Sequence, residues 1–166
     1  MIRRLTVRDA ERVLEFLLAL DEASVRFFHP HQFDLDHVLR LLRGRLSGEV
    51  DAFGAADSDG SLTGYVWLSD MQTAHPSLGI CVAEGRRDRV LGRALMVRAL
   101  DEAALRAKAE VRLSVMPENA RALHLYTSLG FEVASTVEGR HGPYLCMTCR
   151  LDTSAAARAA DRKSVV

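Results

Sequence analysis

The stretch MPENARALHLYTSLGF, residues 116–131, has the pattern of a short amphipathic helix. Its apolar side chains recur at helical spacing, Pro117 and Asn119 mark a start, and Gly130 marks an end. A helix that only packed against a core would not need a phenol on its apolar face and an amide just before its first turn. Tyr126 is therefore either a buried aromatic residue or a proton donor, and spacing alone favours the buried aromatic residue.

The overall composition is that of one globular domain with a local functional site. A chain of 166 residues is the usual size of a single domain. Lys and Arg together number 22, as do Asp and Glu, so no global field is present to hold nucleic acid or a charged membrane. We therefore expect neither of these partners.

Cellular location and redox state follow from the first residues and from the cysteines. Charges run through the apolar part of residues 1–20, which excludes a signal peptide or a membrane span there. The three cysteines, Cys81, Cys146 and Cys149, are too few and odd in number for a disulfide framework. The sequence predicts a cytoplasmic protein, and the excess of Arg over Lys suggests a GC-rich bacterial genome.

The order of predicted elements indicates a mixed α/β (α+β) fold with a largely antiparallel sheet. Thr6 and Asp9 predict a capping pair for a helix that extends to about Ala23, and Asp34 predicts the cap of a second helix. A further long helix is expected over about 90–109. The predicted strands and loops are strands 1–5, 50–56, 62–70, 77–82, 110–115, 132–137 and 144–151, with loops at 25–33 and 138–143.

The tail, residues 152–166, contains helix formers but few side chains to bury. We expect it to be a flexible C-terminal segment. A helix that docks at an oligomer interface is the alternative.

Residues 78–93 predict an anion site. The apolar strand LGICV leads through a loop to the start of a long helix, where unpaired backbone N–H groups and the helix dipole favour negative charge. Four arginines flank this point: Arg86, Arg87, Arg89 and Arg93. Taken alone, such a charged loop is more often a solvated surface.

Two motifs at the right distance from each other resemble those of the GNAT superfamily of N-acyltransferases, which bind acetyl-coenzyme A. In the family's first motif, Arg/Gln-x-x-Gly-x-Gly/Ala before a helix, Arg87, Val90 and Gly92 fall on the defined places. Asp88 and Val90 stand where the family usually carries glycine. The second motif, Asn-x-x-Ala-x-x-Leu-Tyr-x-x-x-Gly-Phe, is met in full; its matching residues are Asn119, Ala122, Leu125, Tyr126, Gly130 and Phe131.

The resemblance covers residues 1–151, which it identifies as one GNAT-like acetyltransferase domain. It implies a sheet that splays at the central strand, with helices on both faces. It also implies that the backbone of Ile80 and Val82 binds the pantetheine arm, and that Asn119 contacts the same arm. The residues expected at the pyrophosphate are Arg87, Asp88, Arg89, Val90, Leu91, Gly92 and Arg93.

The resemblance implies direct attack of an amine on the acetyl group, with Tyr126 near the sulfur of the cofactor. His75 precedes the central strand and is the candidate general base, since histidine titrates near neutral pH. A solvated loop histidine is the equal alternative. His29 and His31 fall where the family builds its acceptor pocket, so we expect them to bind substrate, with a structural turn around Pro30 as the alternative.

The sequence thus predicts an acetyl-coenzyme A-dependent N-acetyltransferase that needs no metal. The expected acceptor is a primary amine on a small molecule, an amino sugar, an amino acid or a protein N-terminus. A protein N-terminal acetyltransferase is the rival enzyme, and a coenzyme A-binding regulatory domain with weak catalysis is the rival of another class. The oligomeric state stays open, although a homodimer is common for similar folds.

Overall fold

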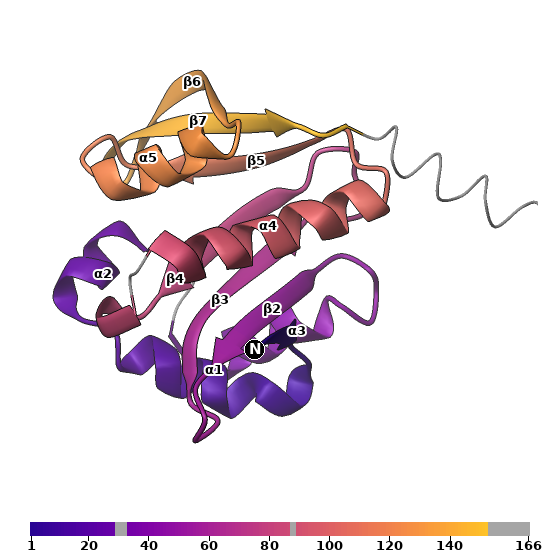
Figure 1. Cartoon of the computed structure of the whole chain (residues 1–166), viewed down its shortest axis with the longest axis vertical. Helices are drawn as coiled ribbons and strands as arrows, with labels where there is room; N and C mark the ends of the chain where they lie inside the picture. Colours follow the sequence, from indigo (N-terminus) through magenta and orange to yellow (C-terminus); the bar gives the residue numbers. More distant parts are fainter. Residues whose placement is uncertain (29–32, 87–88, 153–166) are drawn as a thin grey trace, which may run out of the picture. The chain divides into compact units, whose positions relative to one another are not determined.

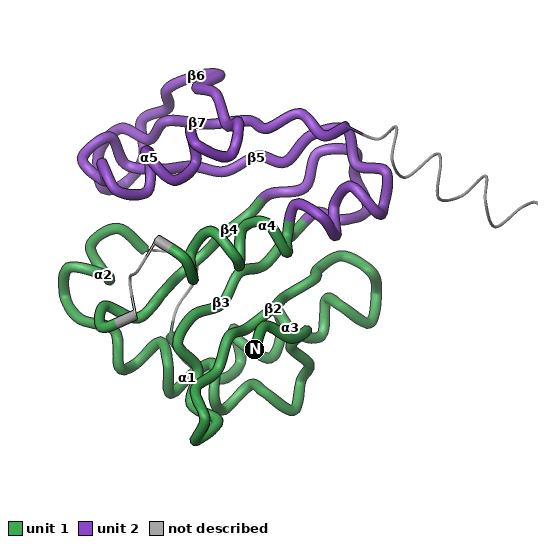
Figure 2. The backbone as a smooth tube through the Cα atoms, in the orientation of Figure 1, with its two compact units in different colours: residues 1–69, 78–99 green, residues 70–77, 100–166 purple. Residues whose placement is uncertain are grey.

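The computed structural model describes residues 1–28, 33–86 and 89–152 (Figure 1). In chain order the elements are β1 (Ile2–Arg4), η1 (Val7–Asp9), α1 (Ala10–Leu18), α2 (Glu22–Phe27), α3 (Leu35–Arg43), β2 (Asp51–Ala56), β3 (Leu62–Ser69), β4 (Ser77–Val82), η2 (Glu84–Arg86), α4 (Arg89–Leu105), β5 (Glu110–Val115), α5 (Ala120–Ser128), β6 (Glu132–Gly139) and β7 (Gly142–Arg150). The chain divides into two compact units, residues 1–69 with 78–99 and residues 70–77 with the described part from 100 onward (Figure 2).

The seven strands follow the order β1-β2-β3-β4-β5-β7-β6. The pairs β1–β2, β2–β3, β5–β7 and β6–β7 are antiparallel. In the described chain, β4 and β5 pair in parallel at Ser77 and Arg112. The structure confirms the predicted mixed, largely antiparallel sheet. The splaying of the sheet at its central strand and the organisation as a single domain stay predictions.

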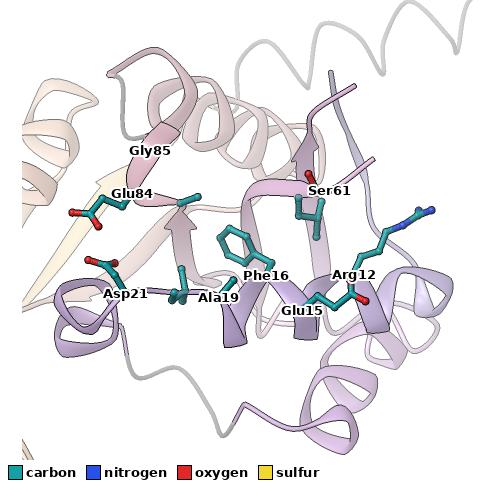
Figure 3. Close-up of a pocket in the computed structure, with 11 residues that line it drawn as sticks. Arg12, Glu15, Phe16, Ala19, Asp21, Ser61, Glu84 and Gly85 are labelled. Carbon is teal, nitrogen blue, oxygen red and sulfur yellow. The ribbon is translucent and has the colours of Figure 1, made fainter. Parts of the chain in front are cut away.

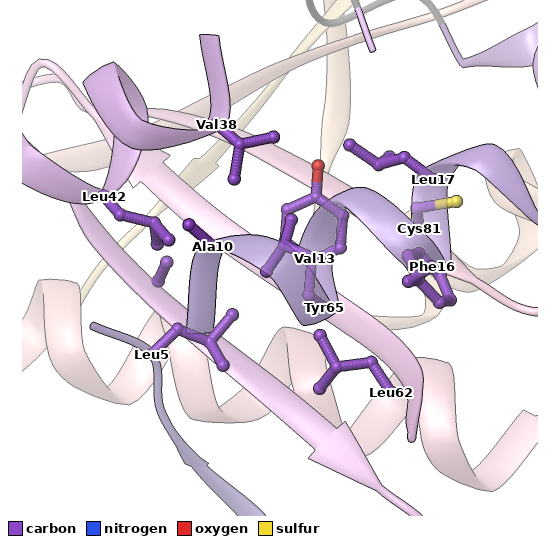
Figure 4. Packing of buried hydrophobic residues seen from close by; sticks show 11 residues of the cluster. Leu5, Ala10, Val13, Phe16, Leu17, Val38, Leu42, Leu62, Tyr65 and Cys81 are labelled. Carbon is purple, nitrogen blue, oxygen red and sulfur yellow. The ribbon is translucent and has the colours of Figure 1, made fainter. Parts of the chain in front are cut away.

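In the first unit, helices pack on both faces of the strands. Ala52 of β2 belongs to a buried cluster contributed by α1, α3 and the strands (Figure 4). The next residue, Phe53, points to the opposite face, where the guanidinium carbon of Arg98 in α4 lies 4.1 Å from its ring centroid. This alternation follows from the two-residue period of a strand. The buried cluster consists of Leu5, Ala10, Val13, Phe16, Leu17, Val38, Leu42, Ala52, Leu62, Tyr65 and Cys81.

The predicted first helix to Ala23 is wrong, because the chain forms two helices in that region. Helix α1 ends at Leu18, and α2 begins at Glu22 after Asp21, whose carboxylate accepts a hydrogen bond from the Ser24 N–H at 3.2 Å. A side-chain cap of this kind starts a new helix. The predicted loop 25–33 is consequently wrong at its start, since α2 continues to Phe27.

Two other predicted boundaries also differ. Helix α4 ends at Leu105 rather than at about 109, and Ala107 shortly after it has a φ of 54°, which a helix cannot accommodate. The predicted loop 138–143 is a tight hairpin between β6 and β7, with Gly142 at a φ of 110°. The predicted cap at Asp34 is confirmed by a 2.9 Å hydrogen bond from the His37 N–H.

The predicted pairing of Thr6 and Asp9 is also confirmed. The Thr6 N–H donates to Asp9 Oδ2 at 3.0 Å, and Arg3 Nη1 donates to the same oxygen at 3.0 Å. The Asp9 side chain is only 6% exposed. The hydrogen bond from Arg3, together with those from Thr6, lowers the pKa of Asp9 to about 2.

Asp9→Asn is expected to reduce the free energy of unfolding at pH 7 by about 2 kcal/mol. A lowered pKa in the folded state means that the stabilisation is complete above pH 4 and is lost as the pH falls towards 2. Urea unfolding between pH 2 and pH 7 should therefore give a flatter stability curve for Asp9→Asn than for the wild type. Asp101→Asn, an exposed change in α4, is the control, and equal acid dependence of wild type and Asp9→Asn would contradict the expectation.

Candidate active site

The direction of the backbone groups of β4 follows from its pairing with β3. The Ala83 N–H donates to the Thr63 carbonyl at 2.9 Å, and Gly79 lies against Trp67, so the two strands run antiparallel. The backbone groups of successive residues in a strand point to opposite edges of that strand. Since Ala83 faces β3, Cys81 faces β3 as well, and the backbone groups of Ile80 and Val82 face the other edge of β4.

Trp67 covers the backbone of β4 at Gly79. A Cβ atom on Gly79 would lie 2.0 Å from Trp67 Cζ2, so this strand passes directly beneath the indole. The Trp67 ring stacks on Tyr65 with ring centroids 5.1 Å apart, and Phe28 packs against its edge at 5.7 Å. Trp67 is therefore a half-buried residue that packs against the buried cluster, and it also shapes the surface of β4.

Tyr65 is a buried phenol that the sequence did not single out. It is 0% exposed, and its hydroxyl has no hydrogen-bond partner in the described part of the chain. Burial raises the pKa of Tyr65 well above its ordinary value, and the neighbouring Cys81 adds a smaller contribution in the same direction. The hydroxyl therefore stays protonated at neutral pH. An alternating strand pattern predicts a buried side chain at this position but carries no sign of an unpaired hydroxyl.

The predicted anion site lies at the start of α4, a helix of 17 residues with no acidic residue in its first turn. Val90 stands in this first turn, is 74% exposed and is absent from the described non-glycine residues with positive φ. A β-branched residue is accommodated there because the backbone is helical. Leu91 is half-buried, Gly92 is buried and Arg93 is exposed. Arg89 opens the helix, whereas Arg87 and Asp88 lie outside the described residues.

The second motif forms α5, in the second unit. Asn119 is the N-cap of this helix, and its side-chain oxygen accepts a hydrogen bond from the Ala122 N–H at 3.2 Å. Tyr126 lies in the last full turn and is only 8% exposed, with its ring centroid 5.9 Å from that of Phe131. The side-chain oxygen of Asn119 thus caps α5. Among the described residues, its side-chain nitrogen has no hydrogen-bond partner.

His75 precedes β4 in the same unit, with a side chain that is 44% exposed. Its Nδ1 lies 3.5 Å from Glu110 Oε1, at the amino-terminal end of β5. Asn119 follows the carboxyl-terminal end of that strand. The structure therefore places His75 and Asn119 at opposite ends of β5 and does not bring them together.

His29 and His31, the expected substrate residues, lie outside the described residues. Across the described ranges, no three His, Cys, Asp or Glu side chains gather in a way that could hold a metal ion. Within the same ranges, every helix is too short or too polar to cross a bilayer.

The sequence profile of the acetyltransferase (GNAT) family matches residues 13–131. The chain belongs to the GNAT family. The matched region begins within α1 and ends directly before β6, and it includes both motifs.

Relatives of this GNAT chain include streptothricin acetyltransferase of Streptomyces lavendulae, 33% identical over 108 residues, which is 58% of this chain and 57% of that protein. Mycothiol acetyltransferase of Beutenbergia cavernae is 42% identical over 76 residues, 45% of this chain and 26% of that protein. The chain thus spans well under two thirds of either relative.

Among solved structures, that of yncA from Salmonella typhimurium with its cofactor acetyl-CoA superimposes with a TM-score of 0.75 and 24% identity. The match covers 92% of this chain and 94% of that one. It shows that the two proteins share the fold.

The GNAT chain also has a pocket that the sequence did not predict (Figure 3). It has a volume of about 420 Å³ and lies entirely in the first unit, between α1, the start of α2, the start of β3 and the segment after β4. We call it the α1 pocket. Its lining residues are Arg12, Glu15, Phe16, Ala19, Leu20, Asp21, Ser61, Leu62, Ala83, Glu84 and Gly85.

Proposed function

We propose that this GNAT chain is an acetyl-coenzyme A-dependent N-acetyltransferase that transfers an acetyl group directly to a primary amine. The observation that carries the proposal is the β4–α4 segment, in which Ile80 and Val82 turn their backbone groups away from β3 just before the N-terminus of a long helix. Extended backbone suits the amides of a pantetheine arm, and a helix N-terminus suits a pyrophosphate.

The residues present fit acetyl-coenzyme A in chemistry. Peptide N–H groups of the first turn of α4 and the positive charge of the exposed Arg93 would complement phosphate oxygens. When bound, the cofactor supplies an acetyl group activated as a thioester. In this proposal the Val82 N–H would donate a hydrogen bond to the thioester oxygen. Asn119 binds the pantetheine arm.

The acceptor must lose a proton before it can attack. An alkyl ammonium with a pKa near 10.4 is deprotonated in about 1 molecule in 2500 at pH 7, which corresponds to roughly 4.6 kcal/mol. Removing that proton is therefore a larger task than protonating the departing thiolate, whose pKa is about 8.5. We assign the first task to a base and the second to Tyr126.

Tyr126→Phe is expected to lower kcat by less than about 10²-fold while leaving the affinity for acetyl-coenzyme A almost unchanged. The phenylalanine ring preserves the packing against Phe131, so only the proton donor is removed. Thiol release under saturating amine measures kcat, and calorimetry measures cofactor binding. Weakened binding with a normal kcat would contradict the assignment.

His75 is the proposed base, with the Glu110 carboxylate holding the orientation of its ring. Because it lies at the end of β5 opposite to Asn119, it would reach the acceptor only through a chain of several water molecules. His29 and His31 are the proposed acceptor-loop residues. The acceptor class includes small amines, amino sugars, amino acids and protein N-termini. The relatives named streptothricin acetyltransferase and mycothiol acetyltransferase make a small molecule the favoured choice.

Calorimetry with acetyl-coenzyme A, followed by thiol release with a broad panel of amines, tests the function. We expect saturable heat and thiol release that depends on the amine. Heat without thiol release from any amine would favour a coenzyme A-binding regulatory domain. A lack of heat at millimolar cofactor would overturn the proposal.

A further inference from the structure

We propose that strand β6 pairs with the β6 strand of a second copy of this chain, so that two chains form a symmetric dimer through a continuous antiparallel sheet. The proposed interface lies in the second unit and follows the two sequence motifs in the chain. It involves none of the groups assigned to catalysis or to cofactor binding, so it stands independently of the proposed function.

Strand β6 is an edge strand of the seven-stranded sheet. It pairs with β7 on one side and with no described strand on the other (Figure 1). It has eight residues, all of them exposed, whereas the strand at the opposite edge, β1, has only three. Natural proteins usually protect a long edge strand with lysine, proline or a covering element. Since β6 contains neither lysine nor proline, it offers a row of peptide groups for pairing with another strand.

The peptide groups that face the free edge of β6 follow from its pairing with β7. Glu138 lies opposite Pro143, which has no N–H, so these two residues cannot exchange a pair of hydrogen bonds. The backbone groups of Glu138 therefore point away from β7. Because successive residues alternate, Thr136 also turns its N–H and carbonyl toward the free edge. A bulge precedes Ser135, so the regular part of this edge is residues 135–139.

The charges at the two ends of the strand select one register. When Thr136 lies opposite Thr136 of the second copy, Glu132 of each chain lies opposite Arg140 of the other. Centring the pairing on Ser135 would instead place Glu132 opposite Glu138, and centring it on Glu138 would place two carboxylates face to face. Opposite charges directly across two strands are stabilising and like charges are destabilising, so the register centred on Thr136 is favoured.

The same two charges indicate a second copy as the occupant of this edge. Glu132 and Arg140 are exposed, and in the described part of the chain neither side chain forms an ion pair. Eight residues of extended chain span roughly 26 Å, so the two side chains cannot pair within one chain. An acid at one end of an edge strand and a base at the other are complementary to their own copy related by a two-fold axis. An unrelated strand would need no such arrangement.

Two paired eight-residue strands form a small interface, so we expect a dimer that dissociates in the micromolar range. Sedimentation equilibrium of the whole chain at about 1 to 200 μM should show a change from monomer to dimer. A wild type that stays monomeric throughout this range would overturn the inference. Masses that grow beyond the dimer would also overturn it, because a two-fold contact closes on itself.

A charge reversal tests the register. Arg140→Glu and Glu132→Arg should each raise the dimer dissociation constant at least about tenfold, because each change places like charges opposite one another twice. The double variant Glu132→Arg/Arg140→Glu should recover the wild-type constant, since both ion pairs re-form with reversed polarity. Arg121→Glu, the same change at an exposed position of α5 in the same unit, is the matched control and should dimerise as the wild type does. Single variants that dimerise normally, or a double variant without recovery, would refute this register.

Thr136→Pro tests the edge itself. Proline removes the N–H that faces the second copy but no hydrogen bond to β7, and edge strands tolerate proline at such positions. Dimerisation should therefore be lost, while the urea midpoint at concentrations where both proteins are monomeric should stay close to that of the wild type. A dimer that persists in Thr136→Pro would exclude β6 as the interface. Unfolding of this variant would show that Thr136 faces β7, which contradicts the proposed pairing.

Discussion

Gly79→Ala is expected to lower the free energy of unfolding by about 2 kcal/mol and kcat/KM by at least tenfold. The new methyl group would lie 2.0 Å from Trp67 Cζ2 and 2.3 Å from Cη2, far inside van der Waals contact. The indole cannot simply turn away, because Tyr65 stacks on it and Phe28 packs against its edge. Either the indole or the β4 backbone must shift, and that backbone is the proposed pantetheine site.

Two further variants make this expectation specific. Gly85→Ala is the stability control, since a Cβ atom there meets nothing within 4 Å. Gly79→Ala/Trp67→Phe removes the part of the indole that clashes and should recover stability relative to Gly79→Ala alone. Urea unfolding measures stability, and thiol release measures kcat/KM. Gly79→Ala with wild-type stability would show that β4 does not pass beneath the indole as described.

Arg4→Met is expected to reduce the free energy of unfolding by about 3 kcal/mol. Arg4 pairs with the carboxylate of Asp51, which is 0% exposed, and its guanidinium carbon lies 4.9 Å from the Phe53 ring centroid. Methionine keeps much of the packing over Phe53 but leaves a buried carboxylate without this cation. A buried charge that loses its partner is more costly than an uncharged pair in the same place.

The double variant Arg4→Met/Asp51→Asn isolates the charge effect. It should be more stable than Arg4→Met alone, because the carboxylate is removed together with its cation. Urea unfolding of the wild type, both single variants and the double variant completes a double-mutant cycle. A double variant no more stable than Arg4→Met would show that lost packing, and not an unpaired carboxylate, causes the destabilisation.

Local features were well predicted because they depend on residues close together in the chain. The caps at Asp34 and Asn119 each use a carboxylate or amide oxygen and an N–H three residues later, so spacing alone identifies them. The break between α1 and α2 was missed although its signal is also local. Asp21 followed by Ser24 is a cap pattern, but the apolar spacing on either side concealed it.

The amino-acid sequence by itself determined the family, through Asn119, Tyr126 and Gly130 at defined spacing, together with most of the kinds and order of the elements. Only the tertiary structure decided the ion pair of Arg4 with Asp51, the indole of Trp67 over Gly79, and the α1 pocket. Residues 47 positions apart meet in the first of these. Such contacts depend on strand register and helix packing, which no short stretch of sequence encodes.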